Sequence, residues 1–330
     1  MKAIVTGATG FLGRHLVSLL QERRFQVLAL GRDRRKGADL QSANTMFKAV
    51  DITDMPALED AFEQADIVFH CAALCSIWGP AEHFDRINVQ GTRHVLACCE
   101  KYAVRRLVYV SSSSIYLDYR SQTDILESQG LAAHFANDYA RTKYAGEVLL
   151  LAEKQNTEVV IIRPRGVIGE GDAVIMPRIL RIADKGFFPL INKGRAIIDL
   201  SYVKNVAHAL VLAGTTAGID GRCFNITNLE PISVKTFLQK VLTHGERTCR
   251  FVPVNYHLIY HFANLLEFVA KNLSLGEPVI TCYGVGLLAN TQTLNVEAAK
   301  NELGYQPLYS LDEGIARYFK EEQRLLSSTG

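Results

Sequence analysis

The sequence lacks any run of about 20 apolar residues, the length that a membrane-spanning helix needs. It also lacks a charge of one sign, because 36 Lys and Arg residues stand against 34 Asp and Glu residues, a net charge of +2. This balance argues against a protein that mainly grips nucleic acid, which usually shows a basic excess. The seven cysteines include no CxxC pair and no disulfide framework, which predicts a protein of the reducing cytoplasm. The first ten residues, MKAIVTGATG, contain no basic segment followed by an apolar run, so no secretory leader is expected.

What the sequence has is enough apolar mass for a folded core. Hydrophobic residues make up 48% of the 330 positions and charged residues 21%, values that exclude a disordered chain. Early in the chain, short apolar segments alternate with amphipathic ones. This alternation predicts an α/β fold with a doubly wound, Rossmann-type parallel sheet and helices on both of its faces. The expected strands are Lys2–Val5, Gln26–Leu30, Phe47–Val50, Asp66–His70, Leu107–Ser111 and Val159–Arg163.

The pattern changes after Arg163, where glycine and proline punctuate a loop-rich stretch. A strand–helix pair returns around Ile197–Leu212, and from Pro231 onward the chain is expected to be mostly helical. We therefore expect residues 1–166 with 197–228 to form the domain that contains the sheet. Residues 167–196 with 229–330 are expected to form a smaller, mostly helical C-terminal lobe.

A glycine-rich loop follows the first expected strand and precedes a helix. Gly7 permits a tight turn, Gly10 lets the backbone approach a pyrophosphate, and Gly13 allows close packing of helix on strand. The free N–H groups of the helix N-terminus favour an anion. A turn without a ligand is the alternative, but the strand and helix around the loop favour NAD(P) binding by this domain, which leaves the C-terminal lobe for the substrate. The other candidate contacts in the loop are Thr9, Phe11 and Leu12.

The end of the second strand bears on the choice of cofactor. Gly31 stands where NAD-binding chains usually carry an acidic residue, and Arg32 follows, which favours the 2′-phosphate of NADP. A solvated basic turn is the alternative explanation for this charge, and Asp33 keeps NAD as an alternative cofactor. Further positive charge nearby comes from Arg14, Arg34, Arg35 and Lys36.

A tyrosine and a lysine four residues apart are the candidate catalytic pair. Tyr139 and Lys143 share one face of an expected helix. A neighbouring ammonium is expected to lower the pKa of the phenol, so that it exchanges a proton with an alcohol or ketone oxygen. Upstream, a serine run follows the strand that ends near Ser111, at the sheet edge where parallel sheets bind ligands. An exposed Tyr–Lys pair without function is the alternative.

With these residues the chain resembles an extended short-chain dehydrogenase/reductase over nearly its whole length. Residues 6–13, TGATGFLG, match the TGxxGxxG loop of that family, and the Tyr139–Lys143 pair matches YxxxK. The resemblance implies a catalytic serine at Ser112, within VSS, and further cofactor contacts in four more motifs. These contacts are Asp51 and Ile52 beside the adenine, Ala72 and Ala73 in HCAA, Asn88 in the NVxGT helix, and Pro164 with Val167 beside the nicotinamide.

Within this superfamily the chain is most similar to the 3β-hydroxysteroid dehydrogenase-like group. Trp78-Gly79-Pro80 and residues 202–209, YVKNVAHA, carry the likeness. Arg163-Pro164-Arg165 resembles the RPR of 2-alkyl-3-oxoalkanoate reductases. The resemblance implies hydride transfer to or from a 3-oxo or 3-hydroxy group of a lipophilic substrate, such as a 3-oxoacid or a steroid. It also implies a homodimer.

Two other functional classes remain open. A nucleotide-sugar epimerase or dehydratase shares the fold, but Ser113 and Ser114 stand where a dehydratase carries an Asp-Glu pair. That substitution argues against dehydration and not against epimerisation. A non-catalytic NADP-sensing protein commonly lacks the catalytic Tyr or Lys, and this chain has both. His70 has no partner at metal-ligand spacing, so no metal site is expected.

Three features have two or more interpretations. Trp78 either lines the substrate pocket or fills the core, and Arg165 either neutralises a substrate carboxylate or bridges the two lobes. The apolar stripe of Leu258–Leu273 is expected to be core. Its alternatives are the wall of an acyl or steroid pocket and a peripheral contact with a membrane surface.

Overall fold

The computed structural model describes residues 1–129, 131–132, 134–273 and 275–328. At its centre is a seven-stranded sheet with the order β12-β7-β5-β4-β1-β2-β3, in which every neighbouring pair is parallel. The expected α/β doubly wound fold is therefore confirmed, and each of the six expected strands forms with ends shifted by at most two residues. The strands are β1 (Lys2–Thr6), β2 (Gln26–Gly31), β3 (Thr45–Ala49), β4 (Ile67–His70), β5 (Arg106–Val110), β7 (Glu158–Pro164) and β12 (Cys223–Ile226).

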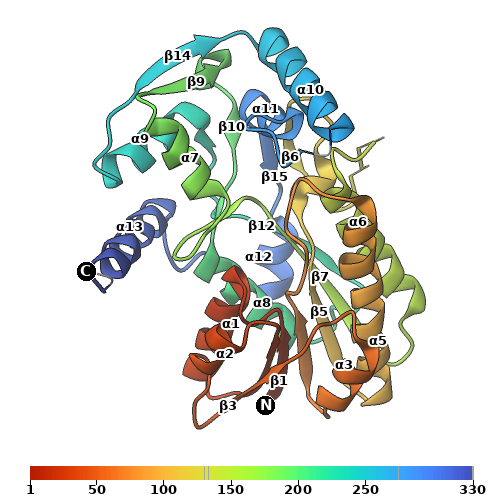
Figure 1. Cartoon of the computed structure of the whole chain (residues 1–330). Coiled ribbons are helices and arrows are strands. Elements are labelled where there is room, and N and C mark those ends of the chain that lie inside the picture. The colour runs from red at the N-terminus through yellow and green to blue at the C-terminus, as the bar shows by residue number, and fades with distance from the viewer. Residues whose placement is uncertain (130, 133, 274, 329–330) are drawn as a thin grey trace.

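Helices cover both faces of this sheet (Figure 1). Because side chains alternate along a strand, β1 sends Ala3 and Val5 into one core cluster and Ile4 into the other. The first cluster is closed by α1 (Phe11–Glu22), α8 (Val203–Thr215) and α12 (Glu297–Leu303). The second is closed by α3 (Met55–Ala61), α5 (Gly91–Lys101) and α6 (Asp138–Glu153). Shorter elements beside them are α2 (Arg34–Ala38), α4 (Ala81–Phe84), the π-helical turn η1 (Asp85–Gln90) and the 3₁₀ turn η2 (Ser113–Tyr116).

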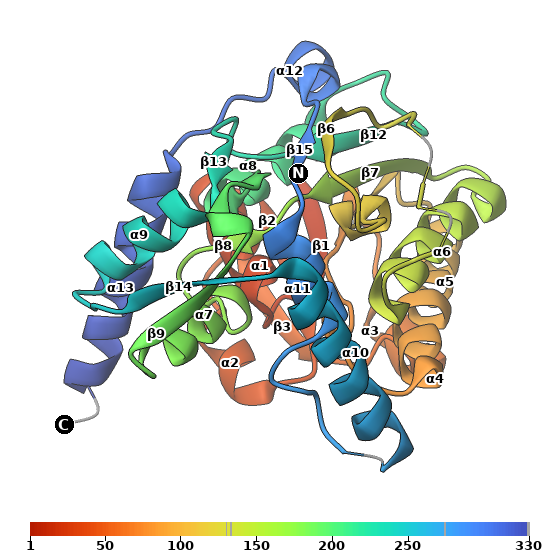
Figure 2. The same cartoon turned by 90° about the horizontal axis from the view of Figure 1, so that it is seen from above.

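The remaining elements lie above the carboxyl edge of the sheet (Figures 1 and 2). A small sheet of order β13-β10-β15-β6 and two strand pairs, β11-β8 and β14-β9, frame this region. Its strands are β6 (Gln122–Ile125), β8 (Val167–Ile168), β9 (Phe187–Ile191), β10 (Ile197–Ile198), β11 (Ser201–Tyr202), β13 (Ile232–Ser233), β14 (Arg250–Val254) and β15 (Gln292–Leu294). Its helical elements are α7 (Ile175–Ala183), the 3₁₀ turn η3 (Asn192–Gly194), α9 (Val234–His244), α10 (Tyr256–Asn272), α11 (Cys282–Ala289) and α13 (Leu311–Ser328). The division of the chain into two lobes stays a prediction, and within it Val296, Ala299 and Tyr305 pack in the same core as β1.

The expectation that the apolar stripe of α10 is core is wrong. Leu258 and Phe268 are 75% and 65% exposed, and Phe262 and Leu265 also face solvent. The covered side of α10 packs on α11 through the buried Ala263 and the partly buried Tyr256, Ile259 and Tyr260. Apolar periodicity shows that one face of a helix is hydrophobic and does not show what covers it. Across the described part of the chain, no helix combines the length and the apolar character needed to cross a bilayer.

Candidate active site

The glycine loop between β1 and α1 is shaped for close backbone approach. Gly7 has φ of +69°, and a Cβ there would lie 2.6 Å from the Ala72 nitrogen. A Cβ at Gly13 would lie 2.2 Å from the Gly7 carbonyl oxygen, so neither position has room for a side chain. Gly10 is exposed and precedes α1, whose first turn no described side chain caps. The loop therefore presents free N–H groups at the β1/β4 switch point of the sheet, where a pyrophosphate fits.

The other predicted contacts of the cofactor lie around the same edge. Thr9 packs closely on Gly31, since a Cβ at Gly31 would lie 2.7 Å from the Thr9 Oγ1 atom. Ile52 is buried beside Gly91, where a Cβ would lie 2.6 Å from its Cδ1. The remaining predicted contacts lie at element ends: Phe11 and Leu12 in the first turn of α1, Ala72 and Ala73 after β4, Pro164 at the end of β7 and Val167 at the start of β8.

Of the charged residues after β2 and β3, Asp33 caps a helix, whereas Arg32 and Asp51 lie beside each other. Asp33 caps α2, since its Oδ1 accepts from the backbone N–H groups of Arg35 at 3.0 Å and Lys36 at 3.1 Å. The Arg32 side chain is 72% exposed and stands 3.7 Å from Asp51. Burial raises the pKa of Asp51, but hydrogen bonds from Thr53 and the charge of Arg32 outweigh it and leave this pKa below its ordinary value. An exposed guanidinium and an oriented carboxylate thus flank the place where an adenosine ribose would lie.

His70 holds the loop after β4 in place as a neutral side chain. Thr92 donates its hydroxyl proton to the Asn88 carbonyl at 2.7 Å, so it accepts from His70 Nε2 at 2.9 Å. His70 Nδ1 then accepts from the Thr6 hydroxyl at 2.7 Å. Burial and the charge of Lys143 lower the pKa of His70 to about 3. The ring is therefore a fixed spacer between β1 and α5.

Asn88, predicted as a cofactor contact, has its amide group fully engaged with protein. Its Oδ1 accepts from the Leu74 N–H at 2.7 Å, and its Nδ2 donates to the Leu74 carbonyl at 3.3 Å and to Thr142 Oγ1 at 3.0 Å. These bonds join the segment after β4 to helix α6. Asn88 thereby positions the helix that carries Tyr139, and a cofactor contact of its own stays a prediction.

The structure brings Ser112 and Tyr139 into contact. Helix α6 begins directly before Tyr139, where Asn137 Oδ1 accepts from the Ala140 N–H at 2.9 Å and caps the helix. Ser112 follows β5 and accepts from the Ser114 N–H at 3.1 Å. It lies close enough to Tyr139 to act on the phenol, because the Ser112 hydroxyl favours a lower pKa of Tyr139. The predicted catalytic serine and tyrosine are therefore neighbours at the carboxyl edge of the sheet.

Lys143 lies one turn further along α6 and is buried, with 2% of its surface exposed. Its ammonium stands 4.0 Å from the centre of the Tyr109 ring. Burial lowers the pKa of Lys143 to about 8. Gly146 leaves the space that this arrangement needs, because a Cβ there would lie 2.4 Å from the Tyr109 hydroxyl.

The expectation that Lys143 lowers the pKa of Tyr139 is wrong for this structure. Burial raises the pKa of Tyr139 well above its ordinary value, Cys75 adds to the rise, and the hydrogen bond from Ser112 opposes it. The reason is that Lys143 is itself desolvated and faces the Tyr109 ring. Tyr139 therefore keeps its proton at neutral pH, which suits a proton donor.

Two residues of the site escaped the sequence analysis. Cys75 lies near Tyr139; the residue as a whole is exposed, but burial of its thiol raises the pKa of Cys75, and Tyr139 opposes that rise. Tyr283 at the start of α11 interacts electrostatically with Tyr139. Cys75 follows the HCAA motif by two residues, yet no pattern marks it, and Tyr283 lies 144 positions from Tyr139 in the numbering of the chain.

Beneath the site lies a buried ion pair that sequence spacing could have revealed. Glu147 is four residues beyond Lys143 on α6, and its carboxylate accepts from Arg163 at 2.9 and 2.5 Å and from the Ser111 hydroxyl. Arg163 also donates to the Tyr116 hydroxyl. The pair ties β5, α6 and β7 together below Ser112, so Arg163 of the RP turn is committed to the protein.

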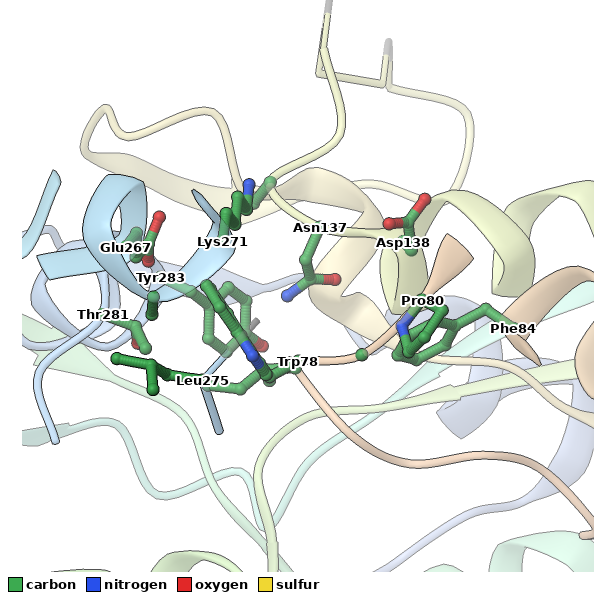
Figure 3. Close-up of a pocket in the computed structure, with 14 residues that line it drawn as sticks. Trp78, Pro80, Phe84, Asn137, Asp138, Glu267, Lys271, Leu275, Thr281 and Tyr283 are labelled. Atoms are coloured by element: carbon green, nitrogen blue, oxygen red, sulfur yellow. The ribbon is translucent and has the colours of Figure 1, made fainter. Parts of the chain in front are cut away.

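A cavity of about 430 Å³ opens beside the start of α6, the helix that carries Tyr139. Its walls come from residues 77–80, the start of α6, α10 and α11 (Figure 3). Trp78 lines this cavity, with the Lys271 ammonium 5.7 Å from its ring centre. Helix α10 contributes Glu267, Ala270 and Lys271. Its large apolar side chains face solvent instead, so the hypothesis that they wall the pocket is wrong.

Comparisons with known proteins support the same interpretation of the site as its geometry does. A family model described as "NAD dependent epimerase/dehydratase family" matches residues 3–227. Sterol-4-alpha-carboxylate 3-dehydrogenase, decarboxylating, of Mus musculus is 31% identical over 327 residues, 96% of this chain and 89% of that protein. The 2-alkyl-3-oxoalkanoate reductase of Stenotrophomonas maltophilia is 31% identical over 330 residues, 96% and 98% of the two chains. Among solved structures, MoeE5 in complex with UDP-glucuronic acid and NAD has a TM-score of 0.77 at 23% identity and covers 98% of this chain and 100% of that chain, a likeness of fold alone.

Proposed function

Because the chain belongs to the NAD dependent epimerase/dehydratase family and is an oxidoreductase of the short-chain dehydrogenase/reductase type, we propose that it transfers a hydride between NADP and the 3-oxo or 3-hydroxy group of a lipophilic substrate. The observation that carries the proposal is the placement of Ser112, after β5, beside Tyr139, at the start of α6, at the same sheet edge as the glycine loop. The names of the mouse dehydrogenase and the Stenotrophomonas reductase support a 3-hydroxy or 3-oxo substrate.

The bound nicotinamide supplies or accepts the hydride, and the protein moves the proton. In reduction, Tyr139 donates its hydroxyl proton to the substrate oxygen as the hydride reaches the carbon. Ser112 donates a hydrogen bond to the same oxygen and holds it in place. Lys143 lies one helical turn away, where its ammonium would hold the ribose of the cofactor. The raised pKa of Tyr139 keeps this proton available at neutral pH.

The preference for NADP over NAD rests on how the residues after β2 are used. The carboxylate of Asp33 is occupied by the cap of α2, and Gly31 has no space for an acidic side chain. The carboxylate of Asp33 is thus held at the start of α2 by its cap and by Lys36, which disfavours the acidic contact to the ribose hydroxyls that NAD-binding chains usually make. Arg32 is exposed and within reach of Asp51, so its guanidinium is available for a 2′-phosphate.

We expect Arg32→Ala to weaken NADPH binding far more than NADH binding. A charge-assisted hydrogen bond contributes about 1.5–3 kcal/mol, which is roughly 10- to 150-fold in affinity. Fluorescence titration of both nucleotides with the same protein measures the two dissociation constants, and NADH serves as the internal control. Equal losses for the two nucleotides, or a preference of the unaltered protein for NADH, would show that Arg32 does not select the cofactor.

The substrate class is tested by NADPH oxidation with 3-oxoacids of increasing chain length, a 3-oxosteroid and UDP-, GDP- and dTDP-sugars. We expect turnover of the lipophilic compounds, with kcat/KM rising about fourfold per added methylene at ~0.8 kcal/mol each until the cavity is full. A flat response to chain length contradicts an apolar pocket. Activity confined to the nucleotide sugars, without net NADPH oxidation, identifies an epimerase, and binding of NADPH without turnover of any compound identifies a sensing protein.

A further inference from the structure

Arg165 is a buried arginine whose charge has no partner within ion-pair distance among the described residues. It is 5% exposed, and its Nε atom is buried without a hydrogen-bond acceptor. The two other buried arginines behave differently, since Arg163 pairs with Glu147 at 2.5 Å and Arg106 with Glu158 at 2.6 Å. Native proteins rarely leave a buried donor unsatisfied, so the guanidinium of Arg165 needs an explanation.

The protein itself does not supply the missing acceptor. Asp199 is the acidic residue that interacts electrostatically with Arg165, yet the two form no ion pair. The Asp199 Oδ2 instead accepts from the Leu294 N–H at 2.7 Å, and burial raises the pKa of this carboxyl. Among the described residues, Arg165 therefore forms no salt bridge that would join the two lobes.

The position of Arg165 places it beside the reacting groups. Strands β5 and β7 are parallel neighbours in which Val110 pairs with Ile162. Ser112 follows the end of β5 by two residues and Arg165 directly follows the end of β7, so the two residues leave the sheet from adjacent strands at its carboxyl edge. Tyr283, which lines the cavity, influences the pKa of both Tyr139 and Arg165. Arg165 therefore lies on the side of the sheet edge that faces Tyr139 and the cavity.

We propose that Arg165 binds a carboxylate of the substrate, so that the site selects free 3-oxo or 3-hydroxy carboxylic acids over their esters and thioesters. This inference rests on the proposed function and adds the group that fixes the substrate. In such an acid one carbon separates the carboxylate from the reacting carbon, so the group that binds the carboxylate has to lie close to the groups that act on the reacting oxygen. A carboxylate offers two acceptor oxygens to the planar fork of a guanidinium, the pairing in which arginine is most effective.

The test compares one free acid, 3-oxodecanoate, with its methyl ester, using NADPH oxidation in the full-length protein. We expect the unaltered protein to prefer the acid, and Arg165→Met to lower kcat/KM for the acid by roughly 10- to 150-fold while the ester changes little. Arg165→Lys keeps the charge without the fork, and we expect it to retain part of the preference. Arg195→Met, an exposed arginine outside the site, should leave the acid-to-ester ratio unchanged.

The ratio of acid to ester separates the possible outcomes. Equal losses for acid and ester in Arg165→Met would show a structural role and overturn the proposal while the reductase function stands. Turnover of neither compound by the unaltered protein would instead overturn the proposed function. If Arg165→Met does not fold, Arg165→Lys decides, because an unchanged ratio in that variant contradicts carboxylate binding and a lower ratio supports it.

Discussion

Replacing Tyr139 by phenylalanine is expected to lower kcat by about 10²- to 10⁴-fold, the range that general acid catalysis contributes. The hydroxyl is the group that carries the proton and lies near Ser112 and Cys75, and this substitution leaves the ring in place. Binding of NADPH should persist, since the glycine loop between β1 and α1 is untouched. Steady-state NADPH oxidation measures the first effect and fluorescence titration the second.

A second tyrosine on the same helix provides the control. The Tyr144 ring packs on Phe135 with 5.6 Å between ring centres, away from Ser112. Tyr144→Phe removes the same oxygen atom one turn further along α6 and should leave kcat within about threefold of the unaltered protein. Turnover by Tyr139→Phe close to that of Tyr144→Phe would refute the assignment of Tyr139 as the proton donor.

The parts of this molecule that sequence predicts well are those that short-range patterns determine. The glycines of the loop can be recognised because Gly7 must adopt a positive φ and because Gly13 leaves no room for a Cβ. Tyr139 and Lys143 share a face of α6 because of helical periodicity alone. The strands follow for the same reason, since both of their faces are buried and their apolar runs are continuous.

What sequence could not predict depends on which groups lie around a side chain. The pKa of Tyr139 is raised because burial and Cys75 outweigh the influence of Ser112, and sequence spacing does not reveal that balance. Leu258 and Phe268 of α10 have the pattern of a core helix, yet the fold leaves that face in solvent. Arg165 stands out only because the structure shows which acceptors it lacks.

The buried pair beneath the site leads to the largest expected effect on stability. Glu147→Leu leaves the Arg163 guanidinium and the Ser111 hydroxyl without the carboxylate that now accepts from both. Removing one partner of a buried ion pair destabilises a protein by about 3–5 kcal/mol, because the remaining charge stays buried and uncompensated. We expect a loss of this size in the free energy of unfolding, measured by urea denaturation followed by circular dichroism.

Helix α6 carries a second ion pair, which differs from the Glu147–Arg163 pair mainly in exposure and therefore serves as a control. Glu153 pairs with Arg93 at 3.0 Å, with both side chains more than 40% exposed, and solvent screens such pairs so that Glu153→Leu should cost at most about 1 kcal/mol. Replacing both buried partners, as Glu147→Leu with Arg163→Met, removes the unpaired charge and should recover part of the loss. If Glu147→Leu loses no more free energy of unfolding than Glu153→Leu does, the buried pair does not hold β5, α6 and β7 together. If the double variant recovers stability, the unpaired charge of Arg163, and not the missing carboxylate, is what destabilises the fold.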